Sequence, residues 1–413
     1  MNATSPPLRP RPATSADAVS VPVAAPAQAP GSTQPLALPR PDDFALSGTF
    51  LNAAFSHPVP KIVAQQMRRH VETRTAGVAN TQAAREQAIR HFARLVGADT
   101  DELAWVPSTT VGENLVVQAL GVAQGGRVIT DALHFEGSLY LYQALASRGV
   151  QLQVLPQQDG QVSLEQYEAA LAVPHAGGPT LVAISLVSAH NGFQHDLQRL
   201  CALAHAQGAR VYADIIQAAG NTPIDLSLSG VDFAACATYK WLMGDFGAGF
   251  LYVRRAVQPQ LRPPQYGYRQ LQAFQTHLFP YDPPAQELFS YEKRGGAAAL
   301  FEVGTVANAA VVALSVSLGY LLDIGVERIE AHRQPMLQLL RAELPRHGYL
   351  PLTPADSRSA IVAFARQDAA ATLGPRLAAA GVQVQLHAHR LRISPSFYNE
   401  LADIERLLDL LAS

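Results

Sequence analysis

Three short apolar runs between residues 210 and 255 constrain the fold of this chain more than any other feature. The first run stops at Asp214, and the second, over residues 233–238, ends at Tyr239 and Lys240. A turn dotted with glycines leads into the third run, over residues 250–253. Apolar runs of this length, bounded by turn residues, are typical of strands in a sheet that is covered on both faces. Because open α/β sheets bind ligands at strand ends, we expect Asp214 and Lys240 to lie at a ligand site.

An acid and a lysine placed in this way suit the chemistry of pyridoxal 5'-phosphate (PLP). The lysine forms a Schiff base with this cofactor, and the acid keeps the pyridine nitrogen protonated so that the ring accepts electrons. Gln217 follows Asp214, and Trp241 and Leu242 follow Lys240. With this spacing the sequence resembles the class V aminotransferase family, which includes cysteine desulfurases, kynureninases and isopenicillin N epimerases. The alternative is a buried lysine whose ammonium only reaches solvent at a strand end.

The resemblance implies an α/β fold, the PLP-dependent transferase fold type I. We expect a large domain with a mostly parallel, seven-stranded-type sheet flanked by helices, and a small α+β C-terminal domain. The residues point the same way, because strands and helices alternate from residue 100 to 255, which predicts a parallel sheet with helices on both sides. The implied cofactor is pyridoxal 5'-phosphate. No metal is expected, since the two cysteines resemble no zinc ligand set.

The chain divides into segments of different composition. Residues 1–40 are rich in Pro, Ala and Ser and predict a disordered tail, whose prolines interrupt the only candidate signal peptide, so we expect a cytoplasmic protein. Residues 41–60 resemble the N-terminal arm of the family, and residues 61–305 the large PLP-binding domain. Within it, residues 259–296 predict a long aromatic loop that forms a wall of the substrate pocket or a dimer contact. Residues 306–413 predict a linker helix and the small C-terminal domain.

Two sequence motifs predict contacts to the cofactor. Thr109 and Thr110 lie at a strand-to-helix turn, where hydroxyls and free backbone N–H groups make an anion site, and in the family this turn holds the cofactor phosphate. Plain capping of the helix is the alternative. The resemblance also places Phe135 over the pyridine ring, although a shift of one residue would place His134 there instead. Gln217 and Tyr239 complete the expected cofactor contacts of one subunit.

Further motifs predict the partner subunit and the substrate contacts. The segment that ends at Thr305 resembles a family motif whose threonine reaches the cofactor phosphate of the neighbouring subunit, which implies a homodimer. The segment departs from that motif at Val303, where proline is usual. Residues 391–399 resemble a C-terminal motif of the family, and this resemblance implies that the guanidinium of Arg392 binds the α-carboxylate of an amino-acid substrate. Asn52 and His57 belong to the arm that borders the active site and are further candidates for substrate binding. An ordinary loop is the alternative for His57.

Charge and hydropathy exclude other classes of partner. The formal net charge is −2 and no basic run is present, which argues against nucleic acid. No stretch approaches 18 consecutive apolar residues, so no segment is expected to cross a membrane. We therefore expect a small amino-acid substrate.

The sequence leaves the reaction open. Lys240 and Asp214 suit aminotransferase-type chemistry, and the alternatives are a carbon–sulfur lyase that works by β-elimination, or an epimerase. Cysteine desulfurases that form a persulfide carry a thiol on a loop near the end of the chain, but residues 383–389 contain no cysteine. Cys201 and Cys236 lie on elements that are predicted to be buried. A remote alternative is a protein that keeps the PLP fold for binding and has lost turnover.

Overall fold

A computed structural model describes residues 36–74 and 81–412. The tail predicted for residues 1–40 lies outside the described residues except for its last five. The described residues form one compact unit. The boundary that we predict between residues 305 and 306 therefore remains a proposal.

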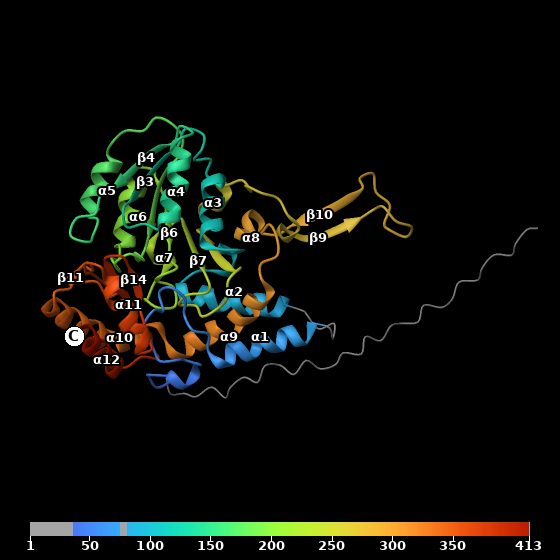
Figure 1. The fold of residues 1–413 in the computed structure, drawn as a ribbon. Coiled ribbons are helices and arrows are strands. Elements are labelled where there is room, and N and C mark those ends of the chain that lie inside the picture. The colour runs from blue at the N-terminus through green and yellow to red at the C-terminus, as the bar shows by residue number, and fades with distance from the viewer. Residues whose placement is uncertain (1–35, 75–80, 413) are drawn as a thin grey trace, which may run out of the picture. The chain divides into compact units, whose positions relative to one another are not determined.

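A seven-stranded sheet with the strand order β2-β8-β7-β6-β5-β3-β4 is the centre of the fold (Figure 1). The four pairings among β7, β6, β5, β3 and β4 are parallel, whereas β8 runs antiparallel to both β2 and β7. The mostly parallel sheet expected from the sequence is thus confirmed. Its strands are β2 (Leu103–Val106), β3 (Arg127–Asp131), β4 (Gln151–Leu155), β5 (Thr180–Ser185), β6 (Arg210–Asp214), β7 (Phe233–Ala237) and β8 (Gly249–Val253).

Alternate residues of each strand pack into two separate cores, one on each face of the sheet. Tyr212 packs with residues of α3 and α4, while its neighbour Val211 packs on the other face with residues of α2, α6 and α9. Both faces are apolar, which explains why the strands read as continuous apolar runs. The helices of this part are α1 (Lys61–Glu72), α2 (Gln82–Val96), α3 (Thr109–Ala119), α4 (Glu136–Ala146), α5 (Leu164–Leu171), α6 (Leu197–Ala206), α7 (Leu226–Ser229), α8 (Gly296–Phe301) and α9 (Asn308–Ile324).

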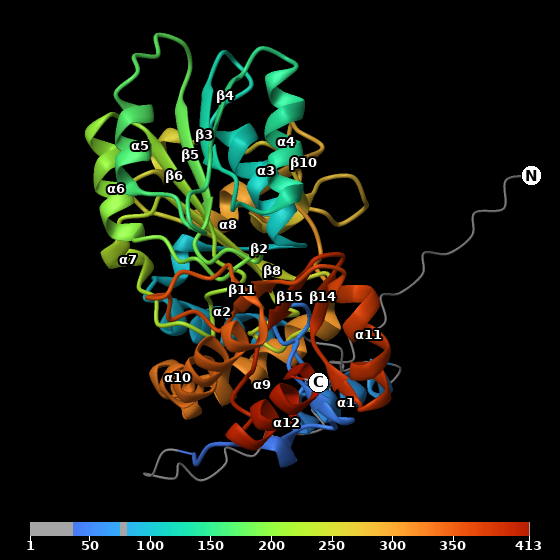
Figure 2. The ribbon, with the colours of Figure 1, turned by 60° about the vertical axis from the view of Figure 1, so that its left-hand side comes forward.

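A second, four-stranded sheet of order β11-β12-β15-β14 follows α9, and all its pairings are antiparallel. Figure 2 shows it between the large sheet and helices α10 and α12. The N-terminal arm joins this part, because β1 (Thr49–Phe50) pairs with β13 (Val382–Gln383). The remaining elements are α10 (Val326–Glu343), β11 (Leu350–Pro351), β12 (Val362–Ala365), α11 (Ala369–Ala379), β14 (Gln385–His387), β15 (Arg390–Ile393) and α12 (Leu401–Ala412).

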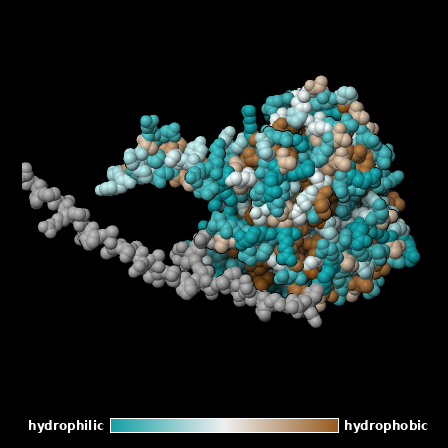
Figure 3. Space-filling model, turned by 180° about the vertical axis from the view of Figure 1, so that it is seen from behind, coloured by the Kyte–Doolittle hydropathy of each residue, from teal (hydrophilic) through white to brown (hydrophobic). Residues whose placement is uncertain are grey.

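The segment 259–296 is not the loop that the sequence predicts. Strands β9 (Leu271–Thr276) and β10 (Phe289–Lys293) pair as an antiparallel hairpin, which extends away from α8 and the large sheet (Figures 1 and 3). The prediction missed these strands because their side chains are largely exposed and so lack the apolar face that identifies a strand. The exposed aromatic side chains of the segment are Tyr266, Tyr268, Phe274, Phe279, Tyr281, Phe289 and Tyr291.

Among the described residues, no single helix is long and apolar enough to cross a membrane. The bent pair formed by residues 308–324 and 326–347 would qualify by length and composition only. Most of the apolar side chains of α9 are buried against the large sheet and its flanking helices.

Candidate active site

The carboxyl ends of neighbouring strands bring the predicted acid and lysine together. Asp214 is the last residue of β6, and Lys240 follows the end of the adjacent strand β7. Ser185, the last residue of β5, pairs in register with Asp214 from the other side. Since these strands are parallel, their ends lie at one edge of the sheet, which is where open α/β sheets bind ligands.

Asp214 offers one oxygen to a ligand. The residue is buried, and its Oδ1 accepts a hydrogen bond of 2.9 Å from the backbone N–H of Ile216. Among the described residues, its Oδ2 has no hydrogen-bond partner. Burial raises the pKa of this carboxyl to about 6, while the Ile216 N–H and the charges of His134 and Lys240 act in the opposite direction. A carboxylate with a free oxygen fits the protonated pyridine nitrogen of PLP.

Lys240 is the one lysine of this sequence whose surroundings suit covalent attachment of a cofactor. The sequence contains only Lys61, Lys240 and Lys293. Lys61 and Lys293 are exposed, and Lys61 donates to the backbone oxygen of Asp42. The ammonium of Lys240 makes no hydrogen bond or ion pair within the described part of the chain. Burial lowers its pKa to about 8, against the opposing charge of Asp214, so a useful fraction of the amine is neutral and nucleophilic.

The N-terminus of α3 lies beside the end of β7 and fits an anion. The Oγ1 of Thr109 accepts a hydrogen bond of 2.8 Å from the backbone N–H of Ala237, and Thr110 is exposed on the first turn. Ser108 caps the helix by accepting from the N–H of Val111. Helix and strand approach closely because a Cβ at Gly112 would lie only 3.2 Å from the Cβ of Ala235. Free N–H groups and hydroxyls at this turn suit the phosphate of PLP, although Thr109 also ties the helix to the sheet.

Phe135 and His134 differ sharply in exposure. The Phe135 side chain is 38% exposed, just before α4, whereas His134 is completely buried. His134 contacts Ser185 through Nδ1 and Glu113 through Nε2, so its ring is held by the protein on both sides. Only Phe135 presents an accessible ring, and stacking of Phe135 on the cofactor remains our prediction.

Gln217 and Tyr239 contact protein groups around Lys240. The amide of Gln217 donates to the backbone oxygen of Ala54 and accepts from Nε1 of Trp241, at 3.0 and 2.9 Å. The ring of Tyr239 stacks on Phe246 with 4.2 Å between centroids, and Nζ of Lys240 lies 5.8 Å from its centre. With its amide engaged at both ends, Gln217 positions Trp241 beside the lysine, and direct contact with the cofactor remains a proposal.

Arg392 has one buried donor without a partner among the described residues, and its charge acts on Lys240. It lies on β15, and its Nη1 donates to the backbone oxygen of Ala189 at 2.7 Å. Its Nε is buried and has no partner among the described residues. Burial lowers the pKa of Arg392 to about 10, and the like charge of Arg390 adds to this shift. A carboxylate would supply the missing acceptors, which fits the predicted contact with the substrate.

Three other predicted residues have different surroundings. His57 is buried among aromatic rings, and its two ring nitrogens contact the backbone oxygen of Pro58 and the hydroxyl of Ser396, each at 2.8 Å. This leaves no nitrogen for a substrate, so the prediction for His57 is corrected to a structural role. Asn52 donates to Gln385 at 3.4 Å, and its Oδ1 is buried without a partner in the described chain. Thr305 is exposed and contacts the hydroxyl of Tyr268.

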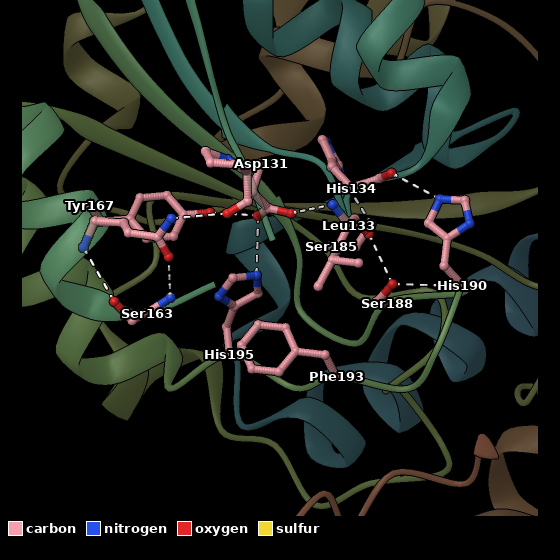
Figure 4. Close-up of polar contacts among 12 residues, drawn as sticks. Asp131, Leu133, His134, Ser163, Tyr167, Ser185, Ser188, His190, Phe193 and His195 are labelled. Carbon is pink, nitrogen blue, oxygen red and sulfur yellow. Dashed lines mark hydrogen bonds and ion pairs between the residues drawn. The ribbon is translucent and has the colours of Figure 1, made fainter. Parts of the chain in front are cut away.

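Sequence reasoning missed a group of buried polar residues behind the site. Asp131, at the end of β3, accepts hydrogen bonds from Tyr167 at 2.5 Å and from the N–H of Leu133 at 2.7 Å, and it pairs with His195 at 3.2 Å (Figure 4). Glu113 on α3 is buried with His134. The only sequence signal was Asp131 at the end of an apolar run, in the same position as Asp214 on its own strand.

Comparison with known proteins identifies the family. The chain matches the family described as Aminotransferase class-V over residues 61–407, and it therefore belongs to that family. It is 29% identical to the uncharacterized aminotransferase YcbU of Bacillus subtilis, over 79% of this chain and 83% of the relative. It is also 26% identical to a probable cysteine desulfurase of Methanothermobacter thermautotrophicus, over 71% of each chain.

Comparison with solved structures confirms the fold. The cystine C–S lyase C-DES, solved in complex with its reaction product cysteine persulfide, superposes with a TM-score of 0.77 at 20% identity. The match covers 89% of this chain and 97% of the lyase. The expected PLP-dependent transferase fold is thereby confirmed, and the protein is a PLP-dependent enzyme of the class V family.

Proposed function

We propose that this protein is a PLP-dependent carbon–sulfur lyase that breaks the Cβ–S bond of cysteine or a related amino acid. Our sequence analysis favoured aminotransferase-type chemistry and kept the lyase as the alternative. The names of several relatives support the lyase, because they are cysteine desulfurases or a cystine lyase. The observation that carries the proposal is the buried amine of Lys240, on which the charge of Asp214 acts, with no reactive thiol in the described chain.

Each residue of the site has a distinct task. PLP supplies the electron sink when bound. Lys240, with its lowered pKa, would hold the cofactor covalently and then take the α-proton of the substrate. Asp214 would keep the positive charge at the pyridine nitrogen, and Arg392 would hold the α-carboxylate so that the bond to be broken stands perpendicular to the ring.

The cysteines argue against a sulfur that stays on the protein. Cys201 lies on α6 and Cys236 on β7, and both side chains are buried. Burial raises the pKa of the Cys201 thiol to about 12 and raises that of Cys236 well above its usual value, so neither forms a thiolate at neutral pH. The sulfur would therefore leave as free sulfide. With L-cysteine and one water, the products would be pyruvate, ammonia and hydrogen sulfide.

Product analysis tests this proposal. Purified holoenzyme is incubated with L-cysteine, and sulfide and pyruvate are measured, in parallel with a Cys201→Ala, Cys236→Ala double variant. We expect both products in equal amounts, and sulfide release by the variant at the rate of the wild type. Loss of sulfide release in a folded variant would show that a protein thiol takes part. Absence of sulfide with every thiol substrate would reject the lyase.

An aminotransferase is the second candidate. Of the two relatives described above, YcbU matches a longer part of this chain, and it is named an aminotransferase. It would use the same Lys240 and Asp214 but would transfer the amino group to a keto acid. Amino-acid and keto-acid pairs screened for exchange, with no sulfide formed, would favour it over the lyase.

We also propose a homodimer in the cytoplasm. Thr305 supports the dimer, because it is exposed together with Tyr268 at the base of the β9–β10 hairpin and is free to meet a second copy. The exposed aromatic side chains of that hairpin support the same interface.

A further inference from the structure

A buried ion pair lies next to Ser185, the register partner of Asp214, and takes no part in the roles proposed above. Nε2 of His134 lies 3.1 Å from Oε1 of Glu113, and both side chains are almost fully buried. Glu113 projects from α3, whereas His134 follows the end of β3, so the pair joins a helix on one face of the sheet to the strand ends. A buried ion pair is costly to desolvate and calls for compensating contacts.

Those compensating contacts are present. Oε1 of Glu113 also accepts from the hydroxyl of Tyr142 at 2.6 Å, and Oε2 accepts from the hydroxyl of Ser138 at 2.5 Å. Both donors are buried residues of α4. The carboxylate is therefore held by three groups, and fully satisfied networks of this kind fix the positions of their members.

His134 connects this network to Asp214. Its Nδ1 lies 2.8 Å from Oγ of Ser185, and Ser185 is the register partner of Asp214 on the adjacent strand. The charged and titratable groups that act on His134 are Glu113, Asp131 and Asp214, and Tyr142 lies against its ring at 6.3 Å between centroids. Carboxylates thus surround the imidazole from α3, β3 and β6.

We propose that Glu113 and His134 are a positioning pair that holds a positive imidazolium behind Asp214 and so keeps that carboxylate ionised toward the pyridine nitrogen of PLP. The inference rests on the proposed role of Asp214. The inference names Glu113 and His134 as the groups that keep Asp214 ionised although its side chain is buried. The pair acts through position and charge, since His134 contacts Ser185, the register partner of Asp214 on the adjacent strand.

The signs of the charges agree with this arrangement. Burial lowers the pKa of His134, but the hydrogen bond and charge of Glu113, together with the charges of Asp131 and Asp214, outweigh burial and raise it overall. The charge of His134 lowers the pKa of Asp214 more than the charge of Glu113 raises it. The pair therefore acts on Asp214 as a dipole with its positive end nearer. With PLP bound, one proton would lie between the pyridine nitrogen and the carboxylate of Asp214. Loss of the charges of the pair would raise the pKa of Asp214 and so favour that proton on the carboxylate oxygen.

The test is the position of that proton, read by the ¹⁵N chemical shift of the pyridine nitrogen in holoenzyme loaded with ¹⁵N-labelled PLP. In the wild type we expect the shift of a protonated pyridine at pH 7.5. In Glu113→Gln and His134→Gln we expect a displacement toward the unprotonated value, larger in His134→Gln because it leaves the charge of Glu113 uncompensated. The control is Ser138→Ala, which removes one hydrogen bond to Glu113 but no charge, and should keep the wild-type shift.

The outcomes separate this inference from the proposed function. A wild type that binds no PLP, or binds it with an unprotonated nitrogen, would contradict the role of Asp214 itself. A protonated wild type with unchanged shifts in both charge variants would reject the positioning pair alone, as would an equal displacement in Ser138→Ala. If the charge variants do not fold, Ser185→Ala provides the decision. This variant removes the hydroxyl that fixes Nδ1 of His134 beside the strand of Asp214, so the imidazolium is no longer held there and the shift should move in the same direction. An unchanged shift in this variant would reject the pair.

Discussion

Asp214 ends β6 and Lys240 follows the end of the neighbouring parallel strand β7, and the charge of each opposes the effect that burial has on the other. Burial raises the pKa of Asp214 to about 6 and lowers that of Lys240 to about 8, while their mutual attraction acts in the opposite direction for both. The result is a carboxylate that is still ionised at neutral pH, beside an amine of which a part is neutral. Both states are needed to hold PLP covalently and to keep its ring protonated.

Replacement of the acid tests the electrostatic part of this arrangement. Asp214→Asn keeps the size of the side chain but removes the charge that holds the pyridinium. We expect PLP to remain bound and the turnover of amino acids to fall about 10²–10³-fold, the range for loss of one preorganised electrostatic contact. Steady-state kinetics of the holoenzyme measure the loss, and an unchanged turnover number would show that another group holds the ring.

The two arginines of β15 provide a matched pair for substrate binding. Arg392→Lys keeps the charge but loses the parallel N–H donors, so KM for amino acids should rise roughly 10- to 100-fold while PLP affinity is unchanged. Arg390→Lys is the control, since this side chain occupies the same face of the strand two residues earlier. It should leave KM close to that of the wild type. An exchange of the two effects would move the carboxylate site to Arg390.

The buried histidine of the N-terminal arm predicts a pH dependence of stability. Burial lowers the pKa of His57 to about 4, with Arg333 adding to the shift and the Pro58 carbonyl opposing it. The unfolded chain takes up this proton below pH ~6.5, but the folded protein does so only near pH 4. Stability is therefore lost as the pH falls through this window, by up to roughly 3 kcal/mol.

Urea denaturation of the wild type and His57→Asn at pH 7.5 and pH 4.5 measures this contribution. The loss of unfolding free energy between the two values should be smaller in the variant. The exposed His347 offers the control, because His347→Asn should leave the loss unchanged. Equal losses in all three proteins would contradict the assignment of the pH dependence to His57.

A homodimer is expected to be required for activity. If Thr305 contacts the phosphate in the site of a second copy, a separated subunit has an incomplete cofactor site. Sedimentation velocity at assay concentrations should give the mass of two chains, and Thr305→Val should weaken PLP binding without changing that mass. Full activity in a species that sediments as a monomer would exclude the shared site.

The features that could be predicted from the sequence are those that depend on short stretches of neighbouring residues. Apolar runs ending at Asp214 and Lys240 identified two strands and the edge where their ligand lies, because strand ends of a parallel sheet meet at one edge. The C-terminal motif likewise led to Arg392, whose buried Nε has no partner among the described residues.

The parts that were missed depend on contacts between distant segments. His57 was expected at the substrate, but its ring packs on Phe397, which is far away in sequence. The pairing of Glu113 with His134 was not predicted, because an acid in a helix and a histidine in a turn are ordinary until the fold buries them together. The hairpin of β9 and β10 was taken as a loop because its strands have no buried face. The role of His57, the Glu113–His134 pair and the hairpin all depend on burial and on contacts between distant segments. The local sequence pattern contains no information on either.

The most direct test of the central claim is to map the site of cofactor attachment. Holoenzyme is reduced with borohydride, digested and analysed by mass spectrometry, which is unambiguous here because the sequence contains only Lys61, Lys240 and Lys293. We predict a phosphopyridoxyl group on Lys240 alone, with none in Lys240→Ala, which should remain folded and lose the absorbance of lysine-bound PLP. Modification of Lys61 or Lys293 at equal yield, or a Lys240→Ala variant that turns over at the wild-type rate, would contradict the account.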